Sequence, residues 1–239
     1  MNFVTWKLAP ATGNRAFQSE HVNVLRAMLE RNFHAPHKLI CLTDDTGGLD
    51  PRIEALPLPV TGFEHLPNPS SKLYPRMEKD FPSCYRRLWV FSDEARMLGE
   101  RIICIDIDVI VTGDITHLAK KTAPFVGWSS ENFGWNKIAG GLYMLTPGAH
   151  TEVWTDFDPD TSPRIAAAAG NNGSDQAWMS YKLYPPKEMW TDADGVVKIN
   201  WLSRRPPNRQ CLVFTNGHRP PWDQATQKKY PWVSRYWRE

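Results

Sequence analysis

Residues 101–115 read RIICIDIDVIVTGDI, an apolar run that is interrupted by two aspartates one residue apart. β-branched residues of this kind favour a buried strand. In an extended strand, residues i and i+2 face the same side, so Asp106 and Asp108 would project together, roughly 7 Å apart. Two neighbouring carboxylates repel each other unless a cation lies between them. Mg²⁺ or Mn²⁺ would supply that charge and leave positions for phosphate oxygens. Alternatively, both aspartates cap the strand end in water or pair with nearby arginines.

The composition of the whole chain indicates an ordinary α/β protein. Its 239 residues fit one domain, or a domain with an elaborated tail. The net charge of +2 gives no overall field that would favour nucleic acid as a partner. The four cysteines lie far apart, which is typical of reduced core residues and of a cytoplasmic protein. No apolar run has the ~18 residues that a membrane span needs, and no signal peptide is apparent.

Apolar periodicity and turn residues divide the chain into alternating strands and helices. Strands are expected at 2–7, 38–43, 53–58, 101–115, 125–128, 140–146 and 211–215, and helices at 19–33, 85–98 and 174–183, with Ser19 and Ser174 as N-caps. Residues 59–83 are rich in proline and predict an irregular insertion. This alternation predicts a mainly parallel sheet with its ligands at the carboxyl ends of the strands. Asp44, Asp45, Asp106 and Asp108 would then border one crevice.

Several short motifs, in this order along the chain, resemble those of a known family. They are Tyr85-x-Arg87-Leu88, Asp106-x-Asp108-Val109, Gly113-Asp114-Ile115, Ala139-Gly140-Gly141-Leu142, Ser174-Asp175-Gln176 and the segment Gly217–Trp222. Together they resemble the nucleotide-sugar glycosyltransferases of GT-A fold, nearest to the glycogenin and lipopolysaccharide galactosyltransferase type. The resemblance implies a Rossmann-like α/β fold, with a mainly parallel sheet and helices on both faces, over residues 1–226. Residues 227–239 would form a C-terminal tail.

The resemblance also implies roles for individual residues. Asp106 and Asp108 would hold Mn²⁺ or Mg²⁺, with His218 as a candidate third ligand, and Asp175 and Gln176 would act at the transferred sugar. The nucleotide-sugar donor, which the resemblance implies is UDP-linked, would contact a larger set of residues. That set is Thr5, Trp6, Asp44, Asp45, Arg87, Asp106, Ile107, Gly140, Gly141, Gly217 and Arg219. For Asp175 the alternative is a helix N-terminal acid without a ligand, and for Arg86, beside Arg87, it is an ion pair with Asp93 or Glu94.

The chain departs from the family pattern at the closing motif. Phe214 stands where the family has a metal-binding histidine, so the third ligand is left open among His218, Asn216 and water. Arg219 would replace the family's phosphate-binding lysine. Ala139 or Gly140 occupies the place of the family's sugar-binding asparagine. The resemblance is nearest to retaining enzymes, whose sites lack a well-placed general base, and no carboxylate or histidine is singled out as one here, so the resemblance implies retention of configuration.

The resulting prediction is a metal-dependent transferase that moves a sugar from a nucleotide sugar to a saccharide, a lipid-linked saccharide or another hydroxyl acceptor. One alternative is a phosphatase of the haloacid-dehalogenase type, since Asp106-Ile107-Asp108-Val109 also fits its nucleophile motif. Another is a nucleotide-sugar or glycan-binding protein without turnover. Residues 227–239, QKKYPWVSRYWRE, interleave cations with aromatic residues. This pattern predicts either peripheral membrane contact, at the inner face of a membrane, or an ordinary docked tail.

Overall fold

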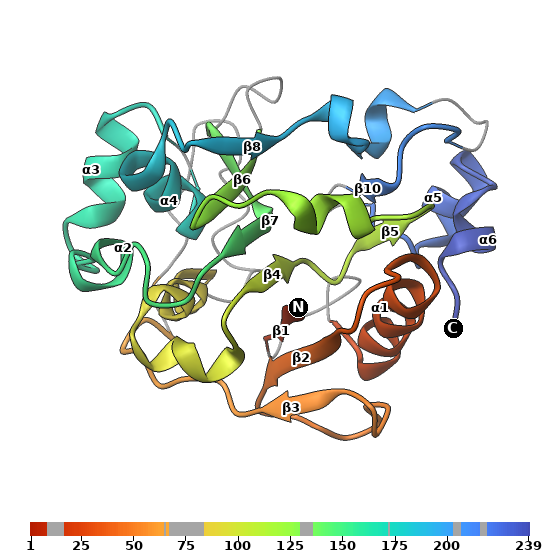
Figure 1. The fold of residues 1–239 in the computed structure, drawn as a ribbon, viewed down its shortest axis with the longest axis horizontal. Helices are drawn as coiled ribbons and strands as arrows, with labels where there is room; N and C mark the ends of the chain where they lie inside the picture. The colour runs from red at the N-terminus through yellow and green to blue at the C-terminus, as the bar shows by residue number, and fades with distance from the viewer. Residues whose placement is uncertain are drawn as a thin grey trace.

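A central sheet of seven strands organises the fold (Figure 1). The computed structural model describes residues 1–8, 17–64, 66, 84–129, 136–171, 173–202, 207–215 and 219–239. The order of the strands across the sheet is β3-β2-β1-β4-β7-β6-β8. They span Asn2–Lys7 (β1), Lys38–Thr43 (β2), Glu54–Leu56 (β3), Ile102–Ile105 (β4), Phe125–Ser129 (β6), Ile138–Leu145 (β7) and Glu188–Trp190 (β8).

The sheet is mostly parallel, as predicted. β1 pairs in parallel with β2 and β4, β2 with β3, and β6 with β8. β7 is the exception, because it runs antiparallel to both β4 and β6. In consequence the start of β7, where Gly140 and Gly141 lie, reaches the same edge as the carboxyl end of β4, with Ile105 paired to Leu142.

The prediction of one continuous strand through residues 101–115 is wrong. β4 ends at Ile105, a turn follows, and the chain resumes as β5 in a second sheet of three strands. That sheet has the order β5-β10-β9, with β5 at Val109–Val111, β9 at Val196–Lys198 and β10 at Leu212–Phe214. The switch has a physical cause, because the backbone after Asp108 finds its hydrogen bonds on β10 rather than on β7. Asp106 and Asp108 therefore lie in the link between two sheets.

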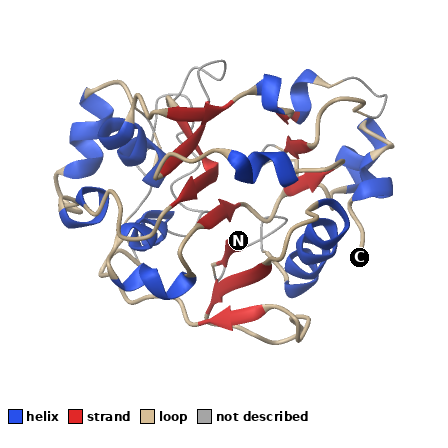
Figure 2. Cartoon of the chain, viewed as in Figure 1, coloured by secondary structure: helices blue, strands red, loops and turns tan. Residues whose placement is uncertain are grey.

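Helices cover both faces of the central sheet, as Figure 2 shows and as the family resemblance implies. The α-helices span Ser19–Asn32 (α1), Glu152–Thr155 (α2), Ser162–Ala168 (α3), Asp175–Leu183 (α4), Gln224–Lys229 (α5) and Val233–Tyr236 (α6). The 3₁₀-helices span Cys84–Phe91 (η1), Glu94–Leu98 (η2), Thr116–Lys120 (η3), Asp192–Asp194 (η5) and Ile199–Trp201 (η6).

Two details of the predicted helices are wrong. Residues 85–98 form the two 3₁₀-helices η1 and η2 instead of one α-helix, with Ser92 and Asp93 between them. Four consecutive side chains, 88–91, are buried, so η1 is enclosed on most sides and lacks the polar face of a surface helix. The N-cap of α1 is Gln18, whose capping partner is His21, while the hydroxyl of Ser19 donates to the carbonyl of Gly47.

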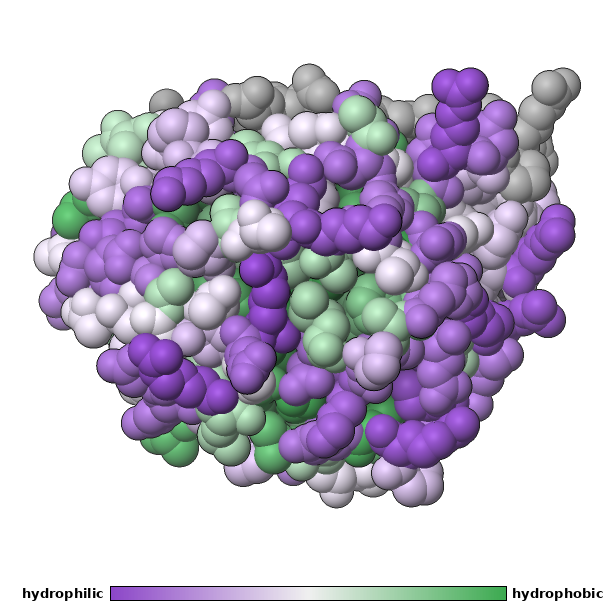
Figure 3. Space-filling model, in the orientation of Figure 1, coloured by the Kyte–Doolittle hydropathy of each residue, from purple (hydrophilic) through white to green (hydrophobic). Residues whose placement is uncertain are grey.

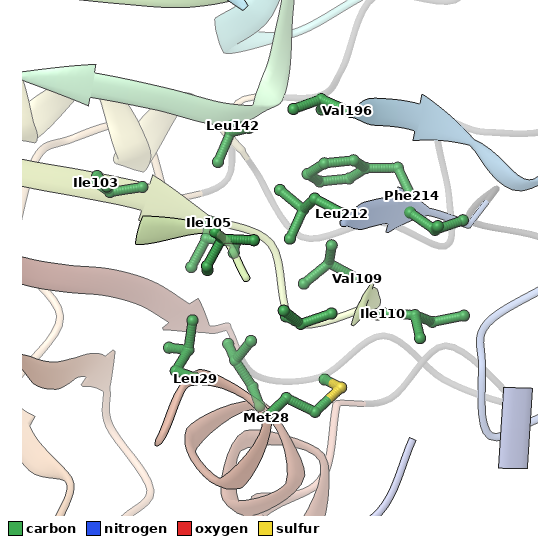
Figure 4. Close-up of a cluster of buried hydrophobic side chains, with 14 of the residues drawn as sticks. Met28, Leu29, Ile103, Ile105, Val109, Ile110, Leu142, Val196, Leu212 and Phe214 are labelled. Atoms are coloured by element: carbon green, nitrogen blue, oxygen red, sulfur yellow. The ribbon is translucent and has the colours of Figure 1, made fainter. Parts of the chain in front are cut away.

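Alternating side chains of the central strands enter two cores. Phe3 of β1 belongs to the core under α1 and the small sheet, and its neighbour Val4 belongs to the core under η1 and α4. Figure 4 shows the first core, where Met28 and Leu29 of α1 approach side chains from β4, β5 and β10. This packing fixes the start of β5 against the end of β4, and thereby positions the two aspartates.

The C-terminal residues pack onto the first core. Tyr230, Trp232 and Trp237 are each less than a tenth exposed, and Arg31 of α1 donates hydrogen bonds to the carbonyls of Tyr236 and Arg238. Residue 227, where the C-terminal tail is expected to begin, lies within α5. Polar side chains dominate the face in Figure 3, around a paler central area. Among the described residues, every helix is too short or too polar to cross a membrane.

Candidate functional site

The guanidinium of Arg87 lies between two carboxylates that come from distant parts of the chain. Its Nη1 donates to Oδ1 of Asp106 at 2.6 Å, and its Nε donates to Oδ2 of Asp175 at 2.7 Å. Arg87 comes from η1, Asp106 from the end of β4 and Asp175 from the first turn of α4. The guanidinium carbon also lies 5.7 Å from the ring centre of Trp6, within cation–π range. Four predicted site residues therefore meet at one point.

Two of these charged side chains, those of Arg87 and Asp175, are largely removed from water. The side chain of Asp175 is 1% exposed and that of Arg87 is 12% exposed. Burial alone would lower the pKa of Arg87, but the charges of Asp175 and Asp106 outweigh it and raise that pKa well above its usual value. Ser174 contributes a further hydrogen bond, from its hydroxyl to Oδ1 of Asp175 at 2.8 Å. Asp175, in the first turn of α4, thus has protein partners on both carboxylate oxygens.

The glycine pair at the start of β7 forms one wall of the site. A Cβ on Gly140 would come within 2.9 Å of Nη2 of Arg87 and 3.0 Å of the Cβ of Gln176. A Cβ on Gly141 would come within 2.9 Å of Oδ2 of Asp106 and 3.0 Å of the ring of Phe214. The backbone of β7 approaches the charged groups as closely as this because neither residue has a side chain.

Gln176 is held against the glycine pair. Its Oε1 accepts a hydrogen bond from the backbone N–H of Gly140 at 3.2 Å. One turn further along α4, Ser180 bonds both the N–H and the carbonyl of Ile138, at 3.0 and 3.2 Å. These contacts join α4 to β7, so that Asp175 and Gln176 keep a constant position relative to the two glycines.

Asp108 lies two residues after Asp106, directly before β5. The hydroxyl of Thr215 donates to the backbone carbonyl of Asp108 at 2.8 Å and contacts its carboxylate at 3.3 Å. Burial, followed by the charge of Asp106, raises the pKa of Asp108 to about 7. Burial also raises the pKa of Asp106, against the opposing effect of Arg87. Two close carboxylates with raised pKa values form a site that a cation would stabilise.

The donor set suits a hard divalent cation only in part. Asp106 and Asp108 offer carboxylate oxygens, which Mg²⁺ and Mn²⁺ prefer. Within the part of the chain that the structure describes, no cluster of three or more His, Cys, Asp or Glu residues could hold a metal. Phe214 stacks on Trp128, with ring centres 4.3 Å apart, and so fills an apolar position. The other third-ligand candidates, Asn216 and His218, lie outside the described residues, as does Gly217.

The predicted nucleotide-binding residues at the ends of β1 and β2 are arranged around a lysine that sequence reasoning missed. Nζ of Lys7, a residue only 6% exposed, lies 2.7 Å from Oδ2 of Asp45 and 3.0 Å from the hydroxyl of Ser19. Thr5 and Trp6 each have a buried polar atom, Oγ1 and Nε1, with no hydrogen-bond partner among the described residues. Such unsatisfied polar atoms are uncommon and suit a polar ligand.

Other predicted residues stand apart from the Arg87 cluster. Arg219 is exposed, and the side chain of Ile107 is buried in the core, which leaves its backbone for ligand contact. Oδ1 of Asp44 accepts from the N–H of Leu58 at 3.2 Å. The expected pairing of Arg86 with Asp93 or Glu94 is wrong, because Arg86 donates to the carbonyl of Pro59 and lies 3.9 Å from Asp44 and 3.8 Å from Glu64. η1 turns it toward the β2 end of the sheet.

A cavity of about 280 Å³ lies away from these residues, between the start of β6 and the end of α4. Its walls include Phe125, His150, Lys182 and Pro185. None of the predicted site residues lines it. The chemistry-bearing groups therefore gather at the carboxyl edge of the sheet and not at this cavity.

Sequence comparison identifies no relatives, since no protein-family model and no curated protein matches the chain. Solved structures do match. The galactosyltransferase LgtC, in complex with donor and acceptor sugar analogues, superposes with a TM-score of 0.59 at 10% identity, covering 99% of this chain and 96% of its own. Mouse xyloside xylosyltransferase 1 gives a TM-score of 0.54 at 10% identity, covering 92% and 99%. The glycosyltransferase GlyE of Streptococcus pneumoniae TIGR4 gives 0.55 at 12% identity, covering 98% and 60%. The fold of this chain is therefore the GT-A fold of these glycosyltransferases, as the motifs predict.

Proposed function

We propose that the protein is a glycosyltransferase, which transfers a sugar from a nucleotide-sugar donor to a hydroxyl group of a saccharide acceptor. The observation that carries this proposal is the Arg87 cluster. A buried arginine joins Asp106, at the link between the two sheets, to Asp175, at the start of α4, beside a glycine pair with no side chains. The cluster lies at the carboxyl edge of a sheet with the GT-A fold, where open α/β sheets bind their ligands.

The donor's diphosphate would lie at Asp106 and Asp108. These two carboxylates would hold Mn²⁺ or Mg²⁺, and the ion's contribution when bound is to offset the charge that develops on the leaving diphosphate. Because Phe214 is apolar and stacked on Trp128, the remaining ligands would come from donor oxygens, from water or from the segment that contains Asn216 and His218. Gly217 and Arg219 would contact the phosphates from the same segment.

The transferred sugar would lie against Gly140 and Gly141. Asp175 can accept hydrogen bonds from sugar hydroxyls, and the hydrogen bond from Arg87 orients that carboxylate. Gln176 uses Oε1 to accept from Gly140, so its amide nitrogen can donate to the sugar. Neither group is placed as an evident general base for an acceptor hydroxyl, which agrees with retention of configuration.

The nucleoside, for which uridine is the proposed identity, would occupy the ends of β1 and β2. There the buried Oγ1 of Thr5 and Nε1 of Trp6 could each find a polar partner on the base or ribose. Asp45, oriented by Lys7, and Asp44 could accept hydrogen bonds from ribose hydroxyls. The diphosphate at Asp106 and Asp108 would then lie between the nucleoside and the sugar at Gly140 and Gly141.

The test combines donor binding with donor turnover. A panel of UDP, GDP, CDP and ADP, each with and without Mn²⁺, is screened by thermal shift, where a ligand at 100 times its Kd adds ~2.7 kcal/mol. We expect stabilisation by UDP that requires Mn²⁺ and is lost in Asp108→Asn but kept in Asp192→Asn, which changes an exposed aspartate. Release of UDP from UDP-sugars should follow the same pattern.

Three outcomes would contradict the proposal in different ways. Metal-independent stabilisation would contradict the coordination of a metal by Asp106 and Asp108. Binding of UDP-sugars without hydrolysis or transfer would indicate a binding protein. Hydrolysis of an aryl phosphate that is abolished in Asp106→Asn would indicate a phosphatase.

A further inference from the structure

Lys198 lies on the same side of the small sheet as the proposed site. It ends β9, where it is paired with Phe214 of β10, and Phe214 is paired in turn with Val109 of β5. Paired residues of neighbouring strands direct their side chains to the same face of a sheet. The ring of Phe214 lies against Gly141 and Trp128. The side chain of Lys198 therefore leaves the sheet toward the glycine pair.

The charge that acts on Lys198 is that of Asp108. Adjacent strands are about 4.8 Å apart, so β9 and β5 are separated by roughly 10 Å, which the long side chain of a lysine can largely span. Asp108 immediately precedes β5. Burial lowers the pKa of Lys198, and the negative charge of Asp108 opposes that effect. Arg87 thus pairs with Asp106, and the charge of Lys198 interacts with that of Asp108.

We infer that Lys198 is a diphosphate-binding residue, which contacts the phosphate oxygens of the nucleotide-sugar donor beside Asp108. The inference rests on the proposed function. An ammonium group on a flexible chain carries three donors and can follow a phosphate as it departs. Phe214 occupies the position where the family pattern has a metal-binding histidine. Lys198, its neighbour on β9, would supply positive charge to the diphosphate there. None of the family motifs includes Lys198, and its role follows from the register of the small sheet.

The experiment measures Kd by titration calorimetry in the presence of Mn²⁺, for UDP or for whichever of GDP, CDP and ADP stabilises the wild type, and for the corresponding nucleoside. Lys198→Met removes the charge while keeping the length of the side chain, and Lys198→Arg keeps the charge. Lys182→Met is the matched control, because Lys182 pairs with Asp156 away from the site. We expect Lys198→Met to weaken diphosphate binding on the order of tenfold to a hundredfold, and to leave nucleoside binding unchanged. Lys198→Arg and Lys182→Met should stay within about threefold of the wild type, a change of less than one kcal/mol.

Two results would overturn the role of Lys198 while leaving the proposed function intact. One is unchanged diphosphate affinity in Lys198→Met. The other is an equal loss of diphosphate and nucleoside affinity, which would show that the residue only supports the shape of the pocket. Melting temperatures confirm that each variant is folded, and Lys198→Gln repeats the measurement if Lys198→Met is not. A wild type that binds no nucleoside diphosphate would contradict the proposed function, and this inference with it.

Discussion

Two buried clusters join distant parts of the chain, and they do so with opposite chemistry. The Arg87 cluster holds a guanidinium between Asp106 and Asp175. The second cluster, which we name the His21 stack, consists of His21 of α1, Trp222 and Trp237. The ring centres of His21 and Trp222 are 3.8 Å apart and nearly parallel, and those of the two tryptophans are 5.6 Å apart. One cluster encloses the charges of Arg87 and Asp175 and half-buries that of Asp106, while the other buries aromatic surface around a histidine that is 4% exposed.

The two clusters contribute differently to the free energy of folding: burying the ions of the Arg87 cluster is costly, whereas burying the rings of the His21 stack is favourable. Burying ions requires several kcal/mol of desolvation per group, and hydrophobic residues of similar volume are often at least as stabilising as a buried ion pair. The charges of the Arg87 cluster are therefore better explained by ligand binding than by stability. The His21 stack buries apolar surface and joins α1 to the residues after β10, so its contribution is to the stability of the fold.

The largest expected effect comes from Arg87→Met. Removing the guanidinium leaves the carboxylate of Asp175 buried without its partner, which should destabilise the fold by about 3–5 kcal/mol. For a chain of this length we expect the melting temperature to fall by about 10 °C. Turnover of UDP-sugars should be lost as well. Calorimetric or spectroscopic melting, together with a UDP-release assay, measures both effects.

The double variant Arg87→Met/Asp175→Asn distinguishes the two effects. With the negative charge of Asp175 removed, we expect most of the lost stability to return while turnover stays absent. Recovery of turnover in the double variant would show that the cluster is a structural ion pair and would remove the contrast between the two clusters.

The His21 stack predicts a loss of stability in acid. Burial lowers the pKa of His21 from 6.5 to about 4. A histidine whose pKa is lowered by folding binds its proton more readily when unfolded, so its contribution is complete above pH 6.5 and decreases as the pH falls toward 4. At pH 5 the loss should be about 2 kcal/mol. Urea unfolding at pH 7.5 and pH 5 measures it. In His21→Asn, which keeps an acceptor for the N–H of Gln18, this part of the pH dependence should disappear. An unchanged pH dependence in the variant would assign the acid sensitivity to other groups.

The sequence predicts the parts of the site that depend on short-range pattern. The strands β1, β2 and β10 and the helix α4 follow from apolar runs and turn residues. That Arg87, Asp106, Asp175 and the glycine pair lie together is implied by the family resemblance of the motifs. Local pattern does not show that β4 ends at Ile105, because the apolar run continues through both sheets. Which strand accepts the backbone after Asp108 depends on β10, which lies about a hundred residues later.

Lys7 and Lys198 illustrate the same limit. Each follows an apolar run and reads as a solvated strand end, and neither belongs to a motif. Their relevance comes from pairing: β1 beside β2 brings Lys7 to Asp45, and β9 beside β10 brings Lys198 toward Asp108. Local pattern does not show the packing of the tail either. Its tryptophans alternate with cations, as they would at a membrane interface, yet in the fold they are buried.

A smaller effect is expected from Gly141→Ala, which tests whether the Arg87 cluster requires close approach of the β7 backbone. The new Cβ would lie 2.9 Å from Oδ2 of Asp106 and 3.0 Å from the ring of Phe214. Displacement of the carboxylate should lower kcat/KM for UDP-sugar turnover by about tenfold, or about 1.4 kcal/mol. Gly113→Ala is the control, because its nearest neighbour would be 3.8 Å away in Cys211. Equal kinetics in Gly141→Ala and the wild type would show that the glycine is not needed for the position of Asp106.

The smallest expected effect concerns membrane binding by residues 227–239, which we expect to be absent with neutral lipid. Trp237 belongs to the His21 stack, and Tyr230 and Trp232 are buried as well, so these rings are not available for insertion into a lipid interface. The cations Lys228, Lys229, Arg235 and Arg238 are exposed, and they would attract only anionic lipid. We therefore expect the protein not to float with neutral phosphatidylcholine vesicles, and any flotation with anionic vesicles to disappear in high salt, because surface charges are then screened. Flotation with neutral vesicles would require the aromatic side chains to leave the core. In that case the His21 stack would be a reversible membrane contact rather than a permanent part of the fold, and the acid sensitivity of His21→Asn and wild type would have to be measured again with lipid present.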